Sequence, residues 1–419
     1  MGDDKKWEEI SDESIKEANA RAEERRQKAQ KRAEQRKMEV QRQRRALIGA
    51  VGALAIVLIL VFALKSCGSE NASQPSSAAT GNGQTASHAA LSTTEAQSTT
   101  SSAATASPTS ITMSFVGDVV LGKDENFDYE TSMNAYYDEN GADYFLEKVK
   151  PAFSSDDLTV INMEGTLTTA DNRADKTFAF KADPSYVDIL KNASVEAANV
   201  ANNHSHDYGD QSLTDTINTL ENAGIRHFGY NDVALLNVNG IKVGLVGTYE
   251  LAKLDGIASS MEDNLARVRN QGAELVVAVF HWGVELDTCP DEYQVKLAHD
   301  AIDHGADLVI GHHPHVLQGI EYYNDKPIAY SLGNFCFGGN THPSEMDTII
   351  FQTTYERDSS GTMGDPVLNI IPCSISSSSS INDYQPHILN DGSSVEKKLV
   401  ARSQEIADTY GASSVYAGS

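Results

Sequence analysis

The chain has 419 residues, of which 40% are hydrophobic and 22% are charged, so most of it can fold. Its net charge of −26 hides a split, because residues 1–45 carry 14 basic and 11 acidic side chains, whereas the remainder carries 19 and 48. The residues after position 45 are acidic enough to repel a phosphate backbone, which excludes nucleic acid as their partner. The cysteines have no CxxC spacing, which excludes a zinc ribbon and a disulfide-dense scaffold.

The first 110 residues are typical of a membrane anchor with an arm on one side and a tether on the other. Residues 1–45 are charged and predict a cytoplasmic arm, and residues 46–64 form an uncharged apolar run long enough for a transmembrane helix. Eight basic residues from Lys28 to Arg45 precede this run and only Lys65 follows closely, so the C-terminal part is expected outside the cell. Residues 65–110, rich in Ser, Thr and Ala, predict a flexible linker. A cleaved signal peptide is the competing interpretation, but its basic region would be too long.

The globular part is predicted at residues 111–390. Apolar runs predict strands at Ile111–Val116, Leu158–Ile161, Val195–Val200, Ile241–Val246, Leu275–Phe280, Leu308–Ile310 and Ile328–Tyr330. Helical patterns lie between them at Val187–Leu190, Leu213–Ala223 and Tyr293–His304. Strands that alternate with helices in this way predict a layered α/β domain. Residues 391–419 are expected to be a C-terminal tail with a last helix over Val395–Asp408.

Polar residues follow six of the predicted strands at the point where each strand ends. The segments are Gly117-Asp118, Asn162–Gly165, Ala201–Asp207, His281–Gly283, Gly311–His315 and Ser331–Asn334. Ligands of α/β sheets bind at the carboxyl ends of the strands. A single Asp or Asn there can simply cap the next helix, but capping does not produce six endings with metal-ligand residue types. Carboxylate, amide and imidazole groups together suit Mn²⁺, Fe or Zn²⁺, so the pattern predicts a metal site.

Six stretches between about Ile111 and about Phe337 resemble one protein family. They are FVGDVVLG, INMEGTLT, NVANNHSHDYG, FHWGVE, GADLVIGHHPHVLQGIE and YSLGNF. They are similar to the CapA-type poly-γ-glutamate capsule biosynthesis proteins of the calcineurin-like metallophosphoesterase superfamily. The resemblance implies a four-layer β-sandwich flanked by helices, one or two divalent metal ions, and work on a capsule or other cell-envelope polymer.

The resemblance also implies a role for each matching residue. The implied metal ligands are Asp118, Glu164, Asn203, His281, His313 and His315, with Glu164 in the bridging place. The implied catalytic residue is His204, which would orient or protonate the leaving group. The residues expected on the substrate side are Asn162, Asn202, Asp207 and Asn334. Val120 stands where the superfamily has a His, so one of the two metal positions lacks an imidazole ligand. The site could therefore hold a single ion instead of two.

Three functions remain open at the level of sequence. The first is a metal-dependent hydrolase that acts outside the cell on a phosphoester or on the envelope polymer. The second is a non-catalytic, metal-binding subunit of a polymer synthase or export complex with other capsule synthase subunits, which the missing His at Val120 favours. The third is a wall-associated binding protein that keeps the fold as a scaffold. No GxxxxGK[ST] motif or Rossmann fingerprint occurs, so the chain is not expected to polymerise glutamate with ATP by itself.

Overall fold

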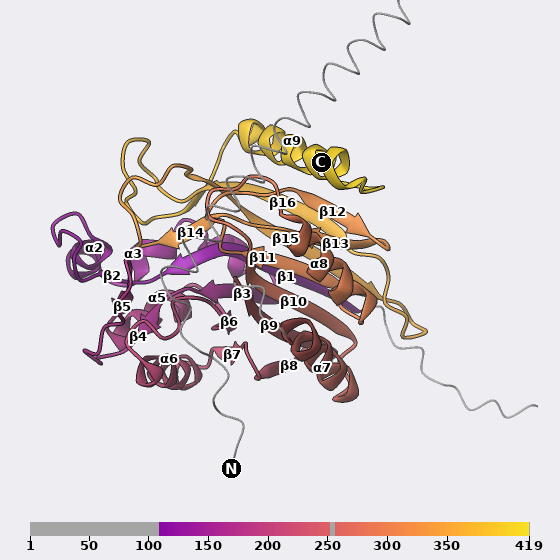
Figure 1. The fold of residues 1–419 in the computed structure, drawn as a ribbon, viewed down its shortest axis with the longest axis horizontal. Helices are drawn as coiled ribbons and strands as arrows, with labels where there is room; N and C mark the ends of the chain where they lie inside the picture. Colours follow the sequence, from indigo (N-terminus) through magenta and orange to yellow (C-terminus); the bar gives the residue numbers. More distant parts are fainter. Residues whose placement is uncertain (1–108, 252–255, 419) are drawn as a thin grey trace, which may run out of the picture. The chain divides into compact units, whose positions relative to one another are not determined.

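The computed structural model describes residues 109–251 and 256–418, all of which belong to one compact unit. These residues form three sheets with helices around them, which confirms the predicted α/β class (Figure 1). The predicted cytoplasmic arm, transmembrane helix and linker lie outside the described residues. Within the part of the chain that is described, no helix is both long enough and apolar enough to cross a bilayer.

The first large sheet has the strand order β17-β16-β15-β1-β3-β6-β7, and β14 also pairs with β1. The strands are β1 (Thr109–Val120), β3 (Leu158–Met163), β6 (Ala197–Asn199), β7 (Arg226–Phe228), β14 (Asn334–Phe337), β15 (Asp347–Arg357), β16 (Val367–Ser374) and β17 (His387–Ile388). β1 is parallel to both β3 and β14, and β3 is parallel to β6. The carboxyl ends of these four strands therefore point the same way.

The second large sheet has the order β12-β13-β11-β10-β9-β8. Its strands are β8 (Val233–Val238), β9 (Ile241–Glu250), β10 (Leu275–Trp282), β11 (Leu308–His312), β12 (Ile320–Tyr323) and β13 (Lys326–Ala329). β10 runs parallel to both β9 and β11, so the ends of these three strands also lie together. A small third sheet is made by β2 (Lys123–Asp124), β5 (Phe180–Ala182) and β4 (Thr166–Leu167).

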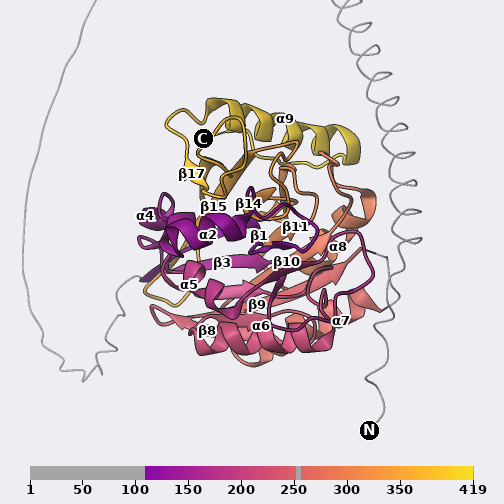
Figure 2. The same cartoon turned by 90° about the vertical axis from the view of Figure 1, so that its left-hand side faces the viewer.

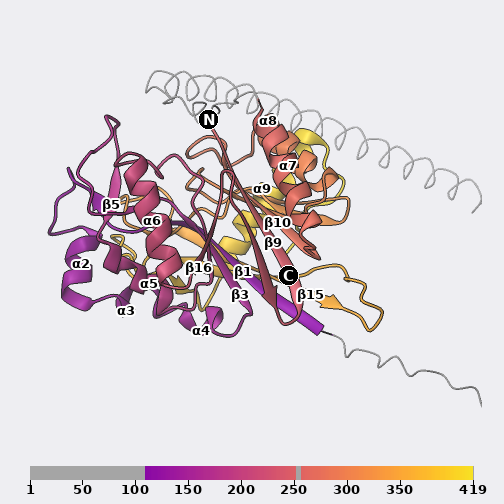
Figure 3. The same cartoon turned by 90° about the horizontal axis from the view of Figure 1, so that it is seen from below.

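Three apolar cores hold these layers together. One core takes alternate residues of β1 and β3 and alternate residues of β9, β10 and β11, so the two large sheets face each other. A second core lies between the first sheet and the helices α2 (Met133–Asn140), α3 (Asp143–Leu146), α4 (Lys150–Phe153), α5 (Val187–Lys191) and α6 (Asp210–Asn222) (Figure 2). A third core joins the second sheet to α7 (Ile257–Asn270) and α8 (Glu292–Asp303) (Figure 3). Strands buried on both faces explain continuous apolar runs such as residues 275–280.

The predicted last helix is confirmed as α9 (Ser393–Tyr410), and it packs on the sheets beside β12 and β16 (Figure 1). Val395 and Leu399 are fully buried in the core between the sheets. Lys398 and Arg402 form ion pairs with Glu345 at 2.6 and 2.8 Å. The C-terminal segment therefore belongs to the packed fold that supports the strand ends.

Candidate metal centre

Strand ends from both large sheets meet at one place. Asp118 at the end of β1 is in register with Asn162 on β3 and with Asn334 on β14. His281 on β10 is in register with His312 on β11. The side chains join the two sheets, because Asn162 Nδ2 donates to Asp118 Oδ1 at 2.8 Å and lies 3.2 Å from His281 Nδ1. Ligand-type residues that are far apart in the sequence therefore share one buried site.

A β-bulge directs Asp118 into this site. The pairing of β1 with β3 changes register between Phe115 and Asp118, and bulges of this kind re-aim side chains. Gly117 is required in the bulge because a Cβ atom there would lie 2.2 Å from the carbonyl oxygen of Gly333. The Asp118 N–H donates to the same carbonyl at 2.9 Å. The close approach of these two backbone segments holds the fully buried Asp118 carboxylate in place.

Glu164 carries a buried carboxylate that accepts no hydrogen bond from any described residue. Its side chain is fully buried, and neither carboxylate oxygen has a hydrogen-bond partner among the described residues. The Oε1 atom faces three imidazoles, with His281 Nε2 at 3.5 Å, His315 Nε2 at 3.7 Å and His204 Nε2 at 3.9 Å. A buried charge without a partner is strongly unfavourable. The arrangement of one buried carboxylate and three imidazoles is therefore typical of a cation-binding site.

The electrostatics of Glu164 agree with this view. Burial, and after it the negative charge of Asp118, raise the pKa of Glu164 well above its ordinary value. Without a cation the carboxyl group would therefore tend to hold a proton. A bound divalent cation reverses this balance, because it stabilises the ionised form of every carboxylate that it contacts.

His281 and Asn203 form a second part of the site. His281 Nε2 lies 2.6 Å from Asn203 Oδ1, although Asn203 belongs to the loop after β6 and His281 to the other sheet. Burial, followed by the charge of His313, lowers the pKa of His281 well below its ordinary value. The ring is therefore neutral at physiological pH, which is the form that binds a metal.

The loop after β11 supplies two further imidazoles under backbone strain. His313 and His315 have φ angles of 94° and 56°, which residues other than glycine adopt only when their surroundings hold them there. The His313 N–H donates to Asp118 Oδ2 at 3.2 Å, which anchors the loop on β1. His313 is buried, and its Nδ1 atom has no hydrogen-bond partner among the described residues. Such strain is typical of functional sites.

Asp118 and His315 carry opposite charges in the absence of a metal. His315 Nδ1 lies 3.3 Å from Asp118 Oδ2 and 2.9 Å from Asn334 Oδ1. Burial alone would raise the pKa of Asp118, but hydrogen bonds and charges from His312 and His315 outweigh it and hold that pKa well below its ordinary value. Burial alone would lower the pKa of His315, but the carboxylates of Glu164 and Asp118 raise it to about 10. A metal that binds His315 must therefore displace a proton.

The ligand-type atoms fall into three overlapping groups whose members lie within 4.8 Å of one another. The groups are Glu164, His281 and His313; Asp118, Glu164 and His315; and Glu285, His313 and His315. These carboxylates and imidazoles, with the amide oxygen of Asn203, fit a divalent metal such as Mn²⁺, Fe or Zn²⁺. Because Glu164 belongs to two groups, the arrangement fits a pair of ions as well as a single one. All six sequence-predicted ligands are brought together here.

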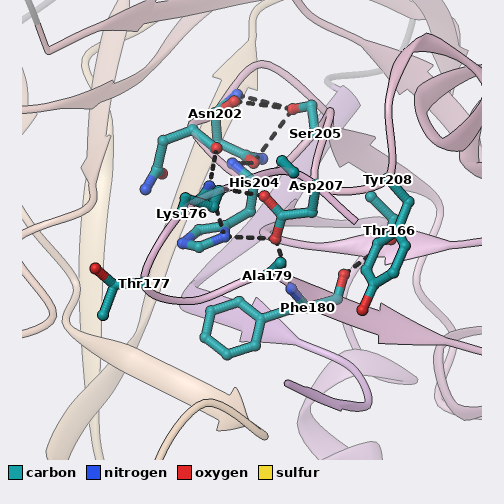
Figure 4. Close-up of polar contacts among 12 residues, drawn as sticks. Thr166, Lys176, Thr177, Ala179, Phe180, Asn202, His204, Ser205, Asp207 and Tyr208 are labelled. Atoms are coloured by element: carbon teal, nitrogen blue, oxygen red, sulfur yellow. Dashed lines mark hydrogen bonds and ion pairs between the residues drawn. The ribbon is translucent and has the colours of Figure 1, made fainter. Parts of the chain in front are cut away.

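His204 lies beside this cluster, with Nε2 3.9 Å from Glu164 Oε1. A network that includes Lys176 and Asp207 holds its ring (Figure 4). Its Nδ1 atom lies 2.7 Å from Asp207 Oδ2, while Lys176 Nζ donates to Asp207 Oδ1 at 2.7 Å and to the Asn203 carbonyl at 2.8 Å. Its Nε2 atom therefore faces Glu164. Burial lowers the pKa of His204 below its ordinary value, and the charge of Asp207 only partly offsets this.

The residues expected on the substrate side are all buried beside the candidate ligands. They are Asn162, Asn202, Asp207 and Asn334. Asn202 Nδ2 donates to the Met163 carbonyl at 2.8 Å, and Asn202 Oδ1 accepts from the His204 N–H at 3.0 Å. In the structure, the side chains of this set contact the candidate ligands or the loop that carries His204. A direct contact with substrate stays a prediction.

Three residues that belong to the site are not among the site residues predicted from the sequence. His312 Nδ1 lies 3.2 Å from Asp118 Oδ1, Asn199 Nδ2 donates to Asn162 Oδ1 at 2.9 Å, and Lys176 holds Asp207. Asn199 was detectable in principle because it is a polar residue inside a short apolar strand. Lys176 lies in the loop before β5, and no local sequence pattern indicated its contact with Asp207.

Comparisons with known proteins show which family the chain resembles. The family model of the bacterial capsule synthesis protein PGA_cap matches residues 112–339. The PGA biosynthesis protein CapA of Bacillus subtilis (strain 168) is 32% identical over 248 residues. This match covers 54% of this chain and 63% of that protein, so the chain spans less than two thirds of this relative. The capsule biosynthesis protein CapA of Bacillus anthracis is 32% identical over 291 residues, 63% of this chain and 67% of that protein.

A solved structure of a hypothetical protein from Thermus thermophilus is similar at a TM-score of 0.39 and 14% identity, covering 62% of this chain and 99% of that chain.

Fold and site together define an α/β protein in which two facing sheets gather a buried cluster of histidines and carboxylates able to hold a metal. Within this class, the chain belongs to the family of bacterial capsule synthesis proteins, PGA_cap. The resemblance to CapA-type proteins that the sequence motifs indicate is confirmed.

Proposed function

We propose that this protein serves the biosynthesis of a capsule or cell-envelope polymer of the poly-γ-glutamate kind, and that it uses a metal-dependent, phosphoesterase-type site. The names of the two Bacillus relatives, which refer to PGA and capsule biosynthesis, support the first part. Glu164 carries the second part, because its buried carboxylate faces three imidazoles and has no hydrogen-bond partner among the described residues. A divalent cation is the partner that satisfies such a carboxylate.

The arrangement of layers supports the same proposal. Two sheets that face each other, each covered by helices on its outer side, correspond to the four-layer sandwich of the metallophosphoesterase superfamily. The candidate ligands lie at the strand ends, where that superfamily has its site. The metal is expected to be Mn²⁺, Fe or Zn²⁺, bound as one or two ions.

A hydrolytic role follows from the chemistry of these groups. A divalent metal held here would act as a Lewis acid on a phosphoryl oxygen. His204 presents Nε2 toward the site because Asp207 holds its Nδ1. An anionic phosphoester beside the ring would raise the pKa of His204 and so favour its protonated form. His204 can then give the proton to the leaving oxygen as a general acid.

The decisive experiment compares His204→Ala with the wild type in the full-length protein, purified in mild detergent and loaded with Mn²⁺. We expect the variant to keep its metal content in elemental analysis, because His204 is assigned to the substrate side. Hydrolysis of glycerophosphocholine, a phosphodiester whose alcohol leaving groups need a proton to depart, should fall by about 10²- to 10⁴-fold. The control is His227→Ala, because His227 lies outside the site and contacts Glu221 at 2.8 Å.

One observation favours a second function, that of a non-catalytic, metal-binding subunit in a polymer synthase or export complex. Val120 is fully buried against Phe180 and Phe337 and offers no ligand where the superfamily has a histidine. Metal bound by the wild type without hydrolysis of any tested phosphoester would make this function the leading one. Equal hydrolysis by wild type and His204→Ala would instead remove the general-acid role.

The proposal includes a single-pass membrane anchor, with the N-terminus in the cytoplasm and the C-terminal domain outside the cell. It is motivated by the uncharged run at residues 46–64 and the basic residues that precede it. Protease added to intact protoplasts is expected to degrade the part from residue 111 onward, as detected with an antibody against the C-terminus. A cytoplasmic protein serves as the control for lysis. Complete protection of the C-terminal part in intact protoplasts, with degradation after lysis, would contradict this topology.

A further inference from the structure

A further carboxylate, that of Glu285, lies at the exposed side of the candidate metal centre. We propose that Glu285 is an additional metal ligand that binds from the solvent side, opposite the buried Glu164. This inference rests on the metal-dependent site proposed above and extends it to a residue of the loop after β10.

The loop that carries Glu285 is fixed against the histidine loop by its backbone. β10 ends at Trp282, and Gly283 then adopts a φ of 83°, where a Cβ atom would lie 2.6 Å from the side chain of Gln294. The Leu286 N–H donates to the carbonyl of Pro314 at 2.8 Å. Pro314 lies between the two histidines of the other loop, so Glu285 is held beside both of them.

The ligand atoms of Glu285, His313 and His315 lie within 4.8 Å of one another. Ligands bound at about 2.0–2.2 Å to one ion are at most about 4.4 Å apart. The three ligand atoms must therefore move closer together to share one ion, and rotation of the exposed Glu285 side chain can provide this movement. Glu285 is exposed, and no hydrogen bond or ion pair within the described ranges holds its side chain in place.

The position of Glu285 relates it to both halves of the site. His313 belongs to the group that contains Glu164 and His281, whereas His315 belongs to the group that contains Glu164 and Asp118. The exposed Glu285 therefore lies near one imidazole of each group on the solvent side. The buried Glu164 lies near the same two imidazoles on the side of the core. His313 adds an independent indication of a ligand, because its ring is buried and its Nδ1 atom has no hydrogen-bond partner among the described residues.

This placement gives Glu285 a distinct chemical role. Its carboxylate adds a negative charge to a site in which Val120 supplies no ligand, and so helps to balance the charge of a second divalent ion. Because the side chain is exposed, it is also the ligand that an anionic substrate group can displace most easily. Metal binding should therefore depend on Glu285, whereas the stability of the metal-free fold should not.

The test is a Mn²⁺ titration of the full-length protein in detergent after removal of metal with EDTA, with free Mn²⁺ measured by electron paramagnetic resonance. Glu285→Gln is expected to weaken the more loosely bound Mn²⁺ by at least about 10-fold, the lower end of what the loss of an outer partner costs. Glu285→Asp, which keeps the charge on a shorter side chain, should lie between the two. The matched control is Glu292→Gln, an exposed glutamate in the first turn of α8.

The melting temperature in EDTA should be the same for the wild type and all three variants. An unchanged Mn²⁺ affinity and stoichiometry in Glu285→Gln, alongside a wild type that binds Mn²⁺, would overturn the role of Glu285 and leave the metal centre intact. A wild type that binds no Mn²⁺ would overturn both. Weaker binding in Glu285→Gln without any phosphoester hydrolysis by the wild type would support Glu285 as a ligand and count against the hydrolase.

Discussion

Replacing His281 with alanine is expected to remove most of the bound metal and to lower the melting temperature of the metal-loaded protein. The ring is fully buried, and its Nε2 atom lies 2.6 Å from Asn203 Oδ1 and 3.5 Å from Glu164 Oε1. A lost outer partner already weakens metal binding by about 10- to 100-fold, so a lost ligand should cost at least about 100-fold. Metal at 100 times its dissociation constant stabilises a protein by about 2.7 kcal/mol, and the variant would lose most of this.

Elemental analysis of folded protein and thermal unfolding with and without EDTA provide the measurements. The difference in melting temperature between wild type and His281→Ala should be much larger with metal than in EDTA, which separates metal loss from loss of packing. Asp118→Ala should behave in the same direction, and His227→Ala should change neither quantity. Unchanged metal content in both ligand variants would overturn the site assignment and favour a scaffold that needs no metal.

The site was predictable where local sequence alone places a residue at a strand end. His281 follows a continuous apolar run, and such a run bounded by polar residues predicts both the buried strand and the place where it stops. The same holds for Asp118 near the end of β1 and for Glu164 directly after β3. Parallel strands of one sheet share a carboxyl edge, which accounts for the meeting of Asp118 and Glu164. His281 joins them because the second sheet faces the first.

The rest depends on contacts between distant segments, which a single sequence does not encode in a local pattern. Glu285 gains its place from a backbone hydrogen bond between Leu286 and Pro314, 28 positions apart. Lys176 reaches Asp207 from a loop without regular structure. The helix α9 was predictable from its pattern, but its packing beside β12 and β16 depends on the order of strands within the sheets.

Glu164→Gln is expected to change stability in opposite directions with and without metal. With metal, the variant loses a carboxylate that two ligand groups share, so it should be less stable than the wild type. Without metal, burial and the charge of Asp118 raise the pKa of Glu164 well above its ordinary value of 4.5. The folded protein then holds a proton that the unfolded chain releases, so the metal-free wild type loses stability as the pH rises from about 4.5 through the raised pKa.

Glutamine does not titrate, so the stability of the Glu164→Gln variant does not fall with rising pH for this reason. In EDTA the variant should therefore gain on the wild type as the pH rises, whereas below pH 4.5 the pKa shift contributes no difference between them. Urea unfolding of both proteins between pH 4 and pH 9, with EDTA and with saturating Mn²⁺, measures the free-energy difference directly. A difference in EDTA that does not vary with pH would show that the buried carboxylate has a partner after all. At neutral pH, we expect the stability difference between the two proteins to change sign when Mn²⁺ is added. The reason is that the cation binds the Glu164 carboxylate, which has no hydrogen-bond partner among the described residues.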